Sequence, residues 1–480
     1  MWRPTHPAST AARDLDQDAH RPEGDLDQLG IGSMRHRVVP PIGVDGWKAQ
    51  GLFISEQVTD EEVCTGPTLS QPVRKNGSRD VDPFEYGEAL SWRNQSYMND
   101  IADRCAPSPH PLSMCQSRAA AFGYPCEEYK VTTEDGYILS LKRIPHGPHD
   151  SNTSTEMRPP VLLFHGLMVD GATWVMSTPK QSLGFILADN GFDVWIANSR
   201  GTNSSRNHTS LSTKDPAYWE WSWDELASYD LPAVLQFAYD HTGEKIHYIG
   251  HSLGTLMILA AFSEHKLLDV VRSAVLLCPI AYLSRTKSKL LKLAAHIFLA
   301  ETVHWLGFHE FNPVGPVAHE VLSQICGDPE INCYDLFSAV AGPDCCLNTS
   351  TFCAFLEHAP QSTSVRNLVH LSQLVRNGGV SRFDYGNAKD NMKHYNQPRP
   401  PPYNLSSIPN HVPIFLTHGG EDYLGDVPDT RHLLRTLVKK HNSDSIEVIY
   451  VPDYAHADFI MAYNAPELIY GPMVDFFKRH

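Results

Sequence analysis

The sequence contains no continuous apolar run that approaches the 18 or more residues of a membrane-spanning helix. It also has no excess of basic residues, because 39 Lys and Arg residues face 55 Asp and Glu residues, for a formal net charge of -16. Binding to nucleic acid needs clustered positive charge, so that class of function is disfavoured, as is strong attraction to anionic membranes. Any contact with lipid should therefore be apolar.

A secretory signal is also missing from the sequence as written, because the first forty residues contain no apolar segment after a basic start. Ten cysteines and several N-glycosylation sequons nevertheless favour an oxidising, glycosylating compartment. We therefore expect the secretory pathway or the extracellular space, with the cytoplasm as the alternative. The sequons begin at Asn76, Asn94, Asn152, Asn203, Asn207, Asn348 and Asn404.

Most of the cysteines fall into two groups, which are Cys105, Cys115 and Cys126, and then Cys326, Cys333, Cys345, Cys346 and Cys353. Their spacings do not resemble zinc knuckles, and no adjoining pair of histidines completes a tetrahedral site. We expect structural disulfides, whose pairing the sequence leaves open, and neither a metal nor an organic cofactor. Cys278 lies inside the apolar run AVLLCP and is expected to be a free core residue.

Residues 1 to about 105 are rich in Pro, Asp, Arg and Ser and show no sustained apolar periodicity. We expect a polar, disordered extension here, followed by one folded domain over residues 106–480. With 42% hydrophobic residues, the chain has enough apolar material for a large core.

From residue 124 onward, β-branched and apolar runs alternate with helical patterns. Residues 124–145 predict a hairpin, because two alternating runs flank Glu134, Asp135 and Gly136. Strands that alternate with helices predict an α/β fold, with a mostly parallel sheet and helices on both faces. Further strands are expected at 158–168, 192–198, 246–250, 270–279, 413–417 and 446–451, and helices at 180–190, 222–242, 253–262, 427–440 and from about 465.

The alternation stops for about 135 residues, between Cys278 and Pro413. A structureless loop of that length is implausible inside a compact domain. We therefore expect an inserted, largely helical, disulfide-linked cap over about residues 281–405. Within it, residues 288–306 are expected to form one helix whose packed face carries Leu291, Ala294, Ala295, Phe298 and Leu299.

The stretch IHYIGHSLGT, residues 246–255, nominates Ser252 as a nucleophile. It combines a short buried strand, a G-x-S-x-G pattern and the start of a buried helix. In a nucleophile elbow, the two glycines allow a sharp turn that holds the serine hydroxyl above a helix N-terminus. The alternative is a glycine-flanked turn with a structural serine.

A serine hydroxyl is a weak nucleophile, so it needs a base and an acid that orients the base. Asp422 follows the strand at 413–417 and His456 follows the strand at 446–451. Catalytic groups of open parallel sheets gather at the carboxyl ends of the strands, so these side chains are expected to converge on Ser252. Asp426 is the alternative acid, although its place before a helix favours a capping role.

An oxyanion hole needs two backbone N–H donors. We expect them at Leu253, directly after the nucleophile, and at Leu167, in the loop after the strand at 158–168. His165 in the same loop is expected to shape the loop by a hydrogen bond, with substrate contact as the alternative.

From about Cys115 to its end, the chain resembles the acid lipases, a family that includes gastric and lysosomal acid lipases and plant triacylglycerol lipase 2-like proteins. The resemblance rests on GYPCEEYKVTTEDGYILSLKRIP, LLFHGLM, ANSRG, YWEWSWDELASYDLPA, GHSLG, SVRNLVHLSQLVRNGG, GGEDYLGD and YAHADFIMAYNAP. It implies an α/β-hydrolase fold with the cap as a lid, and it carries over the roles of Ser252, Asp422, His456, Leu167 and Leu253. Animal members usually have Gln where this chain has Leu253, which resembles the plant pattern and keeps the N–H donor.

We therefore expect a serine ester hydrolase that cleaves neutral lipid esters of the triacylglycerol type at an apolar interface and releases fatty acid through an acyl-enzyme. A carboxylesterase acting on small soluble esters is one alternative, although it would need no large apolar cap. A non-catalytic binding protein with a hydrolase fold is another, which the complete triad disfavours. The sequence predicts no particular protein partner.

Overall fold

The computed structural model describes residues 35–39, 113–149, 157–313, 333–347, 349–439 and 445–480. Its main sheet has ten strands, which are β1 (Arg35–Val38), β2 (Glu127–Thr132), β3 (Tyr137–Ile144), β4 (Pro160–Phe164), β5 (Asp193–Ala197), β6 (Asn207–His208), β7 (Ile246–His251), β8 (Val271–Leu277), β11 (Ile414–Gly419) and β12 (Ile446–Val451). The strand order is β1-β12-β11-β8-β7-β4-β5-β3-β2, with β6 paired to β3. All pairs from β1 to β5 along this order are parallel, so the predicted mostly parallel sheet is confirmed.

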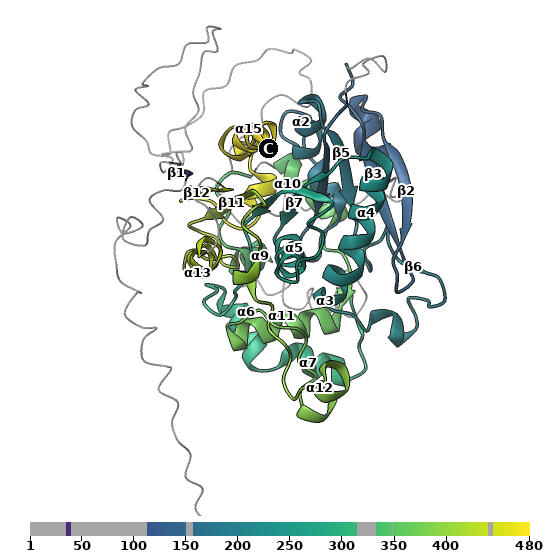
Figure 1. Ribbon diagram of the computed structural model, residues 1–480, viewed down its shortest axis with the longest axis vertical. Helices are drawn as coiled ribbons and strands as arrows, with labels where there is room; N and C mark the ends of the chain where they lie inside the picture. Colours follow the sequence, from purple (N-terminus) through teal and green to yellow (C-terminus); the bar gives the residue numbers. More distant parts are fainter. Residues whose placement is uncertain (1–34, 40–112, 150–156, 314–332, 348, 440–444) are drawn as a thin grey trace, which may run out of the picture.

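Helices cover both faces of this sheet (Figure 1). On β4, Leu162 and Phe164 pack into one apolar cluster, whereas Val161 and Leu163 pack into the other. Because successive side chains of a strand point to opposite faces, this fully apolar strand needs a helical layer on each side. The body helices are α2 (Leu183–Asp189), α3 (Trp223–Glu225), α4 (Leu231–Thr242), α5 (Leu253–Ser263), α13 (Val427–Val438), α14 (Asp458–Met461) and α15 (Gly471–Arg479).

The interval between β8 and β11, here called the cap, is largely helical. Figure 1 shows α6 (Lys289–His296), α7 (Leu299–Trp305), α11 (Val365–Asn377) and α12 (Ala388–Tyr395) grouped at one end of the body, while α10 (Thr349–His358) lies nearer the sheet. A short antiparallel pair, β9 (Glu310–Phe311) with β10 (Thr363–Ser364), also belongs to the cap. The helices are α6 (Lys289–His296), α7 (Leu299–Trp305), α9 (Cys333–Ala341), α10 (Thr349–His358), α11 (Val365–Asn377) and α12 (Ala388–Tyr395).

The single helix predicted over residues 288–306 is wrong. Helix α6 ends at His296 and α7 begins at Leu299, because Phe298 adopts a left-handed conformation with φ 55°. Ala295 is buried as predicted, but Phe298 and Leu299 are about half exposed instead of packed. The Arg376 guanidinium lies 4.3 Å from the centre of the Phe298 ring, a cation–π contact that holds the turn.

Strand β1 was not predicted, because it lies within the segment expected to be a disordered extension. Its four residues pair in parallel with the edge strand β12, from Arg35 beside Glu447 to Val38 beside Tyr450. A strand this short has little order of its own, so its pairing depends on the open edge of the sheet. The rest of residues 1–105 lies outside the described residues.

Of the cysteines, Cys115 forms a disulfide with Cys126, and Cys345 with its neighbour Cys346. Cys278 is free and buried, as predicted. Cys105 and Cys326 lie outside the described residues. In the part of the chain that the structure describes, no helix is long and apolar enough to cross a membrane.

An ion-pair network joins the hairpin to the body, and its Arg200–Asp230 pair is fully buried. The Arg200 guanidinium, at the end of β5, donates to Asp230 at 2.7 Å and to Asp135 of the hairpin turn at 2.6 Å. It also lies 3.7 Å from the centre of the Tyr137 ring. Removing one member of such a network leaves the partner charge buried without compensation.

Replacing Arg200 by Met should therefore lower the free energy of unfolding by about 3–5 kcal/mol. The partly exposed pair of Arg272 with Glu244 provides the control, and Arg272→Met should cost less than about 1 kcal/mol. Denaturant unfolding of both variants measures the difference. Equal losses in the two variants would contradict the structural role assigned to Arg200.

Candidate active site

Ser252 occupies a strained turn between β7 and α5, with φ 53° and ψ −114°. The two glycines make this turn possible. A Cβ at Gly250 would lie 2.7 Å from the backbone of Gly254, and a Cβ at Gly254 would lie 2.7 Å from the carbonyl oxygen of Phe164. Since real Cβ atoms do not approach backbone this closely, both positions require glycine. The pattern thus forms the strand-to-helix elbow that the sequence predicts.

The side chains of Asp422 and His456 meet at the carboxyl ends of β11 and β12. The Nδ1 atom of His456 lies 2.9 Å from Oδ2 and 3.1 Å from Oδ1 of Asp422. The Oδ1 atom also accepts the backbone N–H groups of Leu424 and Gly425, each at 2.8 Å. The carboxylate is fully buried and fixed by its own loop, so it holds the imidazole with Nδ1–H as the donor.

This tautomer leaves Nε2 of His456 as a lone-pair acceptor. The atom is buried and has no hydrogen-bond partner among the described residues. The His456 ring lies 5.1 Å from the ring of His251, the residue directly before Ser252, so His456 and Ser252 share one end of the sheet. The hydroxyl of Ser252 likewise makes no hydrogen bond with a described residue in this conformation.

Asp426, the alternative acid, does not contact His456 in the described structure. It caps α13, where its Oδ1 accepts the backbone N–H of Asp429 at 2.8 Å. Burial raises the pKa of Asp426 to about 7. Asp426 therefore has the capping role that its place before a helix favoured.

The loop expected to supply the second oxyanion donor lies beside the elbow. A Cβ at Gly166 would lie only 3.1 Å from Cβ of Ser252. The N–H groups of Leu167 and Leu253 donate to no other backbone or side-chain acceptor among the described residues. Two unused donors next to a nucleophile are what an oxyanion hole requires.

His165 shapes this loop instead of facing a substrate. Its Nε2 accepts the backbone N–H of Ser199 at 3.1 Å, and its Nδ1 lies 2.8 Å from the carbonyl oxygen of Gly166. Burial lowers the pKa of His165 to about 4, so the ring stays neutral and donates from Nδ1.

Comparison with known proteins identifies the family. One family model, described as a partial alpha/beta-hydrolase lipase region, matches residues 115–178, and another, described as the alpha/beta hydrolase fold, matches residues 159–304. The chain is 48% identical over 367 residues to Triacylglycerol lipase 2 of Arabidopsis thaliana, which covers 76% of this chain and 88% of that protein. It is 38% identical over 377 residues to the Gastric triacylglycerol lipase of Homo sapiens, which covers 76% and 91%.

The chain belongs to the acid lipase family. It therefore has the α/β-hydrolase fold that the resemblance implied, and the order of Ser252, Asp422 and His456 along the chain is the order expected for that fold.

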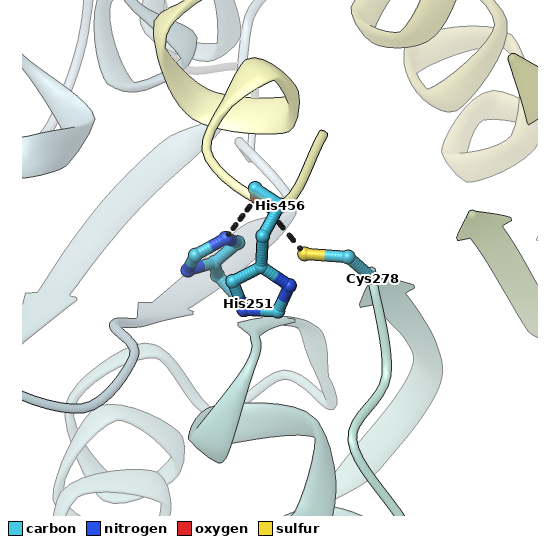
Figure 2. Close-up of side chains that lie close together, drawn as sticks. All are labelled: His251, Cys278 and His456. Atoms are coloured by element: carbon cyan, nitrogen blue, oxygen red, sulfur yellow. Dashed lines mark hydrogen bonds between the residues drawn. The ribbon is translucent and has the colours of Figure 1, made fainter. Parts of the chain in front are cut away.

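Two further side chains of this acid lipase fix the backbone of His456, and the sequence did not reveal them. Figure 2 shows His251 and Cys278 beside His456, both directed at its carbonyl oxygen. Nε2 of His251 lies 3.2 Å from this oxygen, and the Cys278 thiol lies 3.4 Å from it. Burial lowers the pKa of His251 to about 3 and raises the pKa of Cys278 well above its usual value, so both groups keep a proton to donate.

The cap of this acid lipase also contacts the loops that carry the candidate site residues. The carbonyl oxygen of Ala341, at the end of α9, accepts the backbone N–H of both Tyr423 and His456, each at 3.2 Å. The backbone N–H of Gln361 donates to the carbonyl oxygen of Met168 at 2.7 Å, next to the expected oxyanion donor. Cap residues thus contact the loops that carry Asp422, His456 and Leu167.

Asp458 is a third residue that the sequence did not single out. Its fully buried carboxyl group accepts the backbone N–H groups of Ala455, Cys345 and Cys346 at 2.8, 3.2 and 3.4 Å. It therefore ties the loop of His456 to the cap. Burial raises the pKa of Asp458 to about 7, and burial together with the nearby Asp458 raises the pKa of Asp344 well above its usual value.

This arrangement predicts a pH dependence of stability. A carboxyl group whose folded pKa exceeds its unfolded value of about 3.9 lets the native state bind more protons, so its contribution to stability falls as pH rises from about 4 through 7. Between pH 6 and pH 8, the wild type should lose more free energy of unfolding than Asp458→Asn loses. Denaturant titrations at several pH values measure both, with the exposed Asp475→Asn as a control that should follow the wild type. Parallel profiles for wild type and Asp458→Asn would refute this account.

Proposed function

We propose that this protein is a lipase that hydrolyses neutral lipid esters of the triacylglycerol type through an acyl-enzyme on Ser252. The observation that carries the proposal is the pairing of His456 Nδ1 with Asp422 beside the strained serine, which leaves Nε2 free as a base. The names of the relatives, Triacylglycerol lipase 2 and Gastric triacylglycerol lipase, support the substrate class.

In the proposed mechanism, His456 removes the proton of Ser252 as the serine oxygen attacks the ester carbonyl. Asp422 keeps the imidazole oriented and stabilises the imidazolium that forms. The N–H groups of Leu167 and Leu253 stabilise the negative charge on the carbonyl oxygen. His456 then protonates the departing alcohol, and a water molecule activated by the same histidine releases the fatty acid.

The surface of the cap favours a lipid substrate over a small soluble ester. Ser252 is only 5% exposed, whereas several apolar side chains of the cap are exposed to solvent. An exposed apolar surface of this kind suits contact with an insoluble substrate better than capture of a dissolved one. The exposed side chains are Leu290, Leu293, Ile297, Phe298, Leu299, Trp305, Leu306 and Phe308.

We also propose that the lipase domain spans residues 106–480, with the cap at about 281–405, and that the protein enters the secretory pathway. The disulfide between Cys115 and Cys126 supports an oxidising compartment. The described sequons at Asn203, Asn207 and Asn404 are exposed, so a glycan would meet no packed core there.

Two matched carboxylates of one loop test the roles in the triad. Asp422→Asn should lower kcat by about 10⁴-fold, because the amide no longer enforces the tautomer that His456 needs. Asp426→Asn should change kcat by less than about threefold, since this side chain only caps α13. Comparable loss of activity in both variants, with the fold intact by circular dichroism, would contradict the assignment of the acid.

The substrate class is tested separately. Purified protein should release fatty acid from an emulsion of long-chain triacylglycerol, and Ser252→Ala should lose both this activity and labelling by a fluorophosphonate. Turnover of p-nitrophenyl acetate without turnover of the emulsion would favour a soluble-ester carboxylesterase. A wild type that neither labels nor turns over either substrate would favour a binding protein.

A further inference from the structure

Among the described residues, two groups of three side chains offer His, Cys, Asp or Glu ligand atoms within 4.8 Å of one another. The first is His251, Cys278 and His456, whose polar atoms already serve the active site. The second is Glu220, His304 and His309, which takes no part in the proposed chemistry. Its residues come from the body, from the last turn of α7 and from the turn before β9.

In the second group, one nitrogen of each histidine lies close to the same carboxylate oxygen. Oε1 of Glu220 lies 2.9 Å from Nδ1 of His309 and 3.3 Å from Nε2 of His304. The two imidazole rings are 5.0 Å apart and nearly perpendicular, at 80°. All three side chains are between 23% and 37% exposed, so water and small ions reach them.

We propose that Glu220, His304 and His309 form a zinc-binding site. Two imidazole nitrogens and one carboxylate oxygen are a ligand set that Zn²⁺ uses, with water completing a tetrahedron. Ligand atoms at about 2.0–2.1 Å from zinc stand about 3.3 Å apart in that geometry. The two separations from Glu220 Oε1 are already 2.9 and 3.3 Å, and all three ligand atoms lie within 4.8 Å of one another. Each histidine would bind as a neutral ring, with its proton on the nitrogen that faces away from the ion.

Arg366 modulates this site. Its Nη1 lies 3.4 Å from Oε2 of Glu220 and 3.2 Å from the carbonyl oxygen of the same residue. These contacts orient the carboxylate and leave Oε1 for the ion, as outer partners of metal ligands commonly do. The guanidinium charge also repels a cation, so binding should be micromolar instead of nanomolar.

The position of the ligands gives the site a consequence for the cap. His304 and His309 flank residues 305–308, and Trp305 in this turn is 82% exposed. Leu306 and Phe308 are about half exposed. A zinc ion shared with Glu220 would fix this apolar turn against the body. The inference goes beyond the proposed function, because binding of the ion requires no turnover.

Calorimetric titration of the chelator-treated full chain with ZnCl₂ tests the proposal. We expect one equivalent with a micromolar Kd, and at least a tenfold weaker Kd in the double variant His304→Gln and His309→Gln. Zinc should also change the tryptophan fluorescence of the wild type, and Trp305→Phe should lose this change. His296→Gln, in exposed α6, and Cys278→Ala should both bind like the wild type.

Three results would overturn the proposal. They are absence of zinc binding by the folded wild type, unchanged binding by the double histidine variant, and loss of binding in Cys278→Ala, which would assign the ion to the active-site group. Circular dichroism of each variant separates loss of ligands from loss of fold.

Discussion

Residues of four segments meet at His456, and together they fix three of its atoms. Asp422 holds the ring through Nδ1, while His251 and Cys278 hold the carbonyl oxygen of the residue. The backbone N–H of His456 donates to Ala341 of the cap. A general base must lie within hydrogen-bond reach of the proton it removes, so displacement by about 1 Å would be costly. These contacts together fix the loop that carries His456.

The cap therefore also contributes to the geometry of the site. Ala341 bonds to the loops of both the acid and the base, and Gly342, with φ 101°, leaves no room for a Cβ beside the carbonyl oxygen of Glu421. Asp458 adds a second connection between the base loop and the cap. The same insertion carries the exposed apolar side chains of α6 and α7. The exposed apolar surface and the backbone contacts to the loops of Asp422 and His456 thus belong to one segment.

Local sequence patterns predicted many of the site residues. They did not predict contacts between segments that are distant in the sequence. The glycines around Ser252 and the strand ends before Asp422 and His456 have local signatures, so the sequence nominated the residues that the fold brings together. The left-handed Phe298 contacts Arg376, a residue distant in the sequence. A helical pattern cannot show such a contact, so one helix was expected where two exist.

The same limit applies to the groups that fix His456. Cys278 lies in an apolar run of the sequence, so its thiol contact has no separate signal there. His251 occupies the variable position between Gly250 and Ser252 in the elbow pattern. Strand β1 gains its order from an edge formed more than four hundred residues later. Its short run of four residues carries little periodicity of its own.

The most direct measurement is a crystal structure of the protein after reaction with a long-chain alkylphosphonate that mimics the acyl transition state. We expect phosphorus bonded to Oγ of Ser252, with the phosphonyl oxygen about 2.7–3.1 Å from the backbone nitrogens of Leu167 and Leu253. A phosphonate bonded to another residue, or an oxygen directed away from both nitrogens, would contradict it.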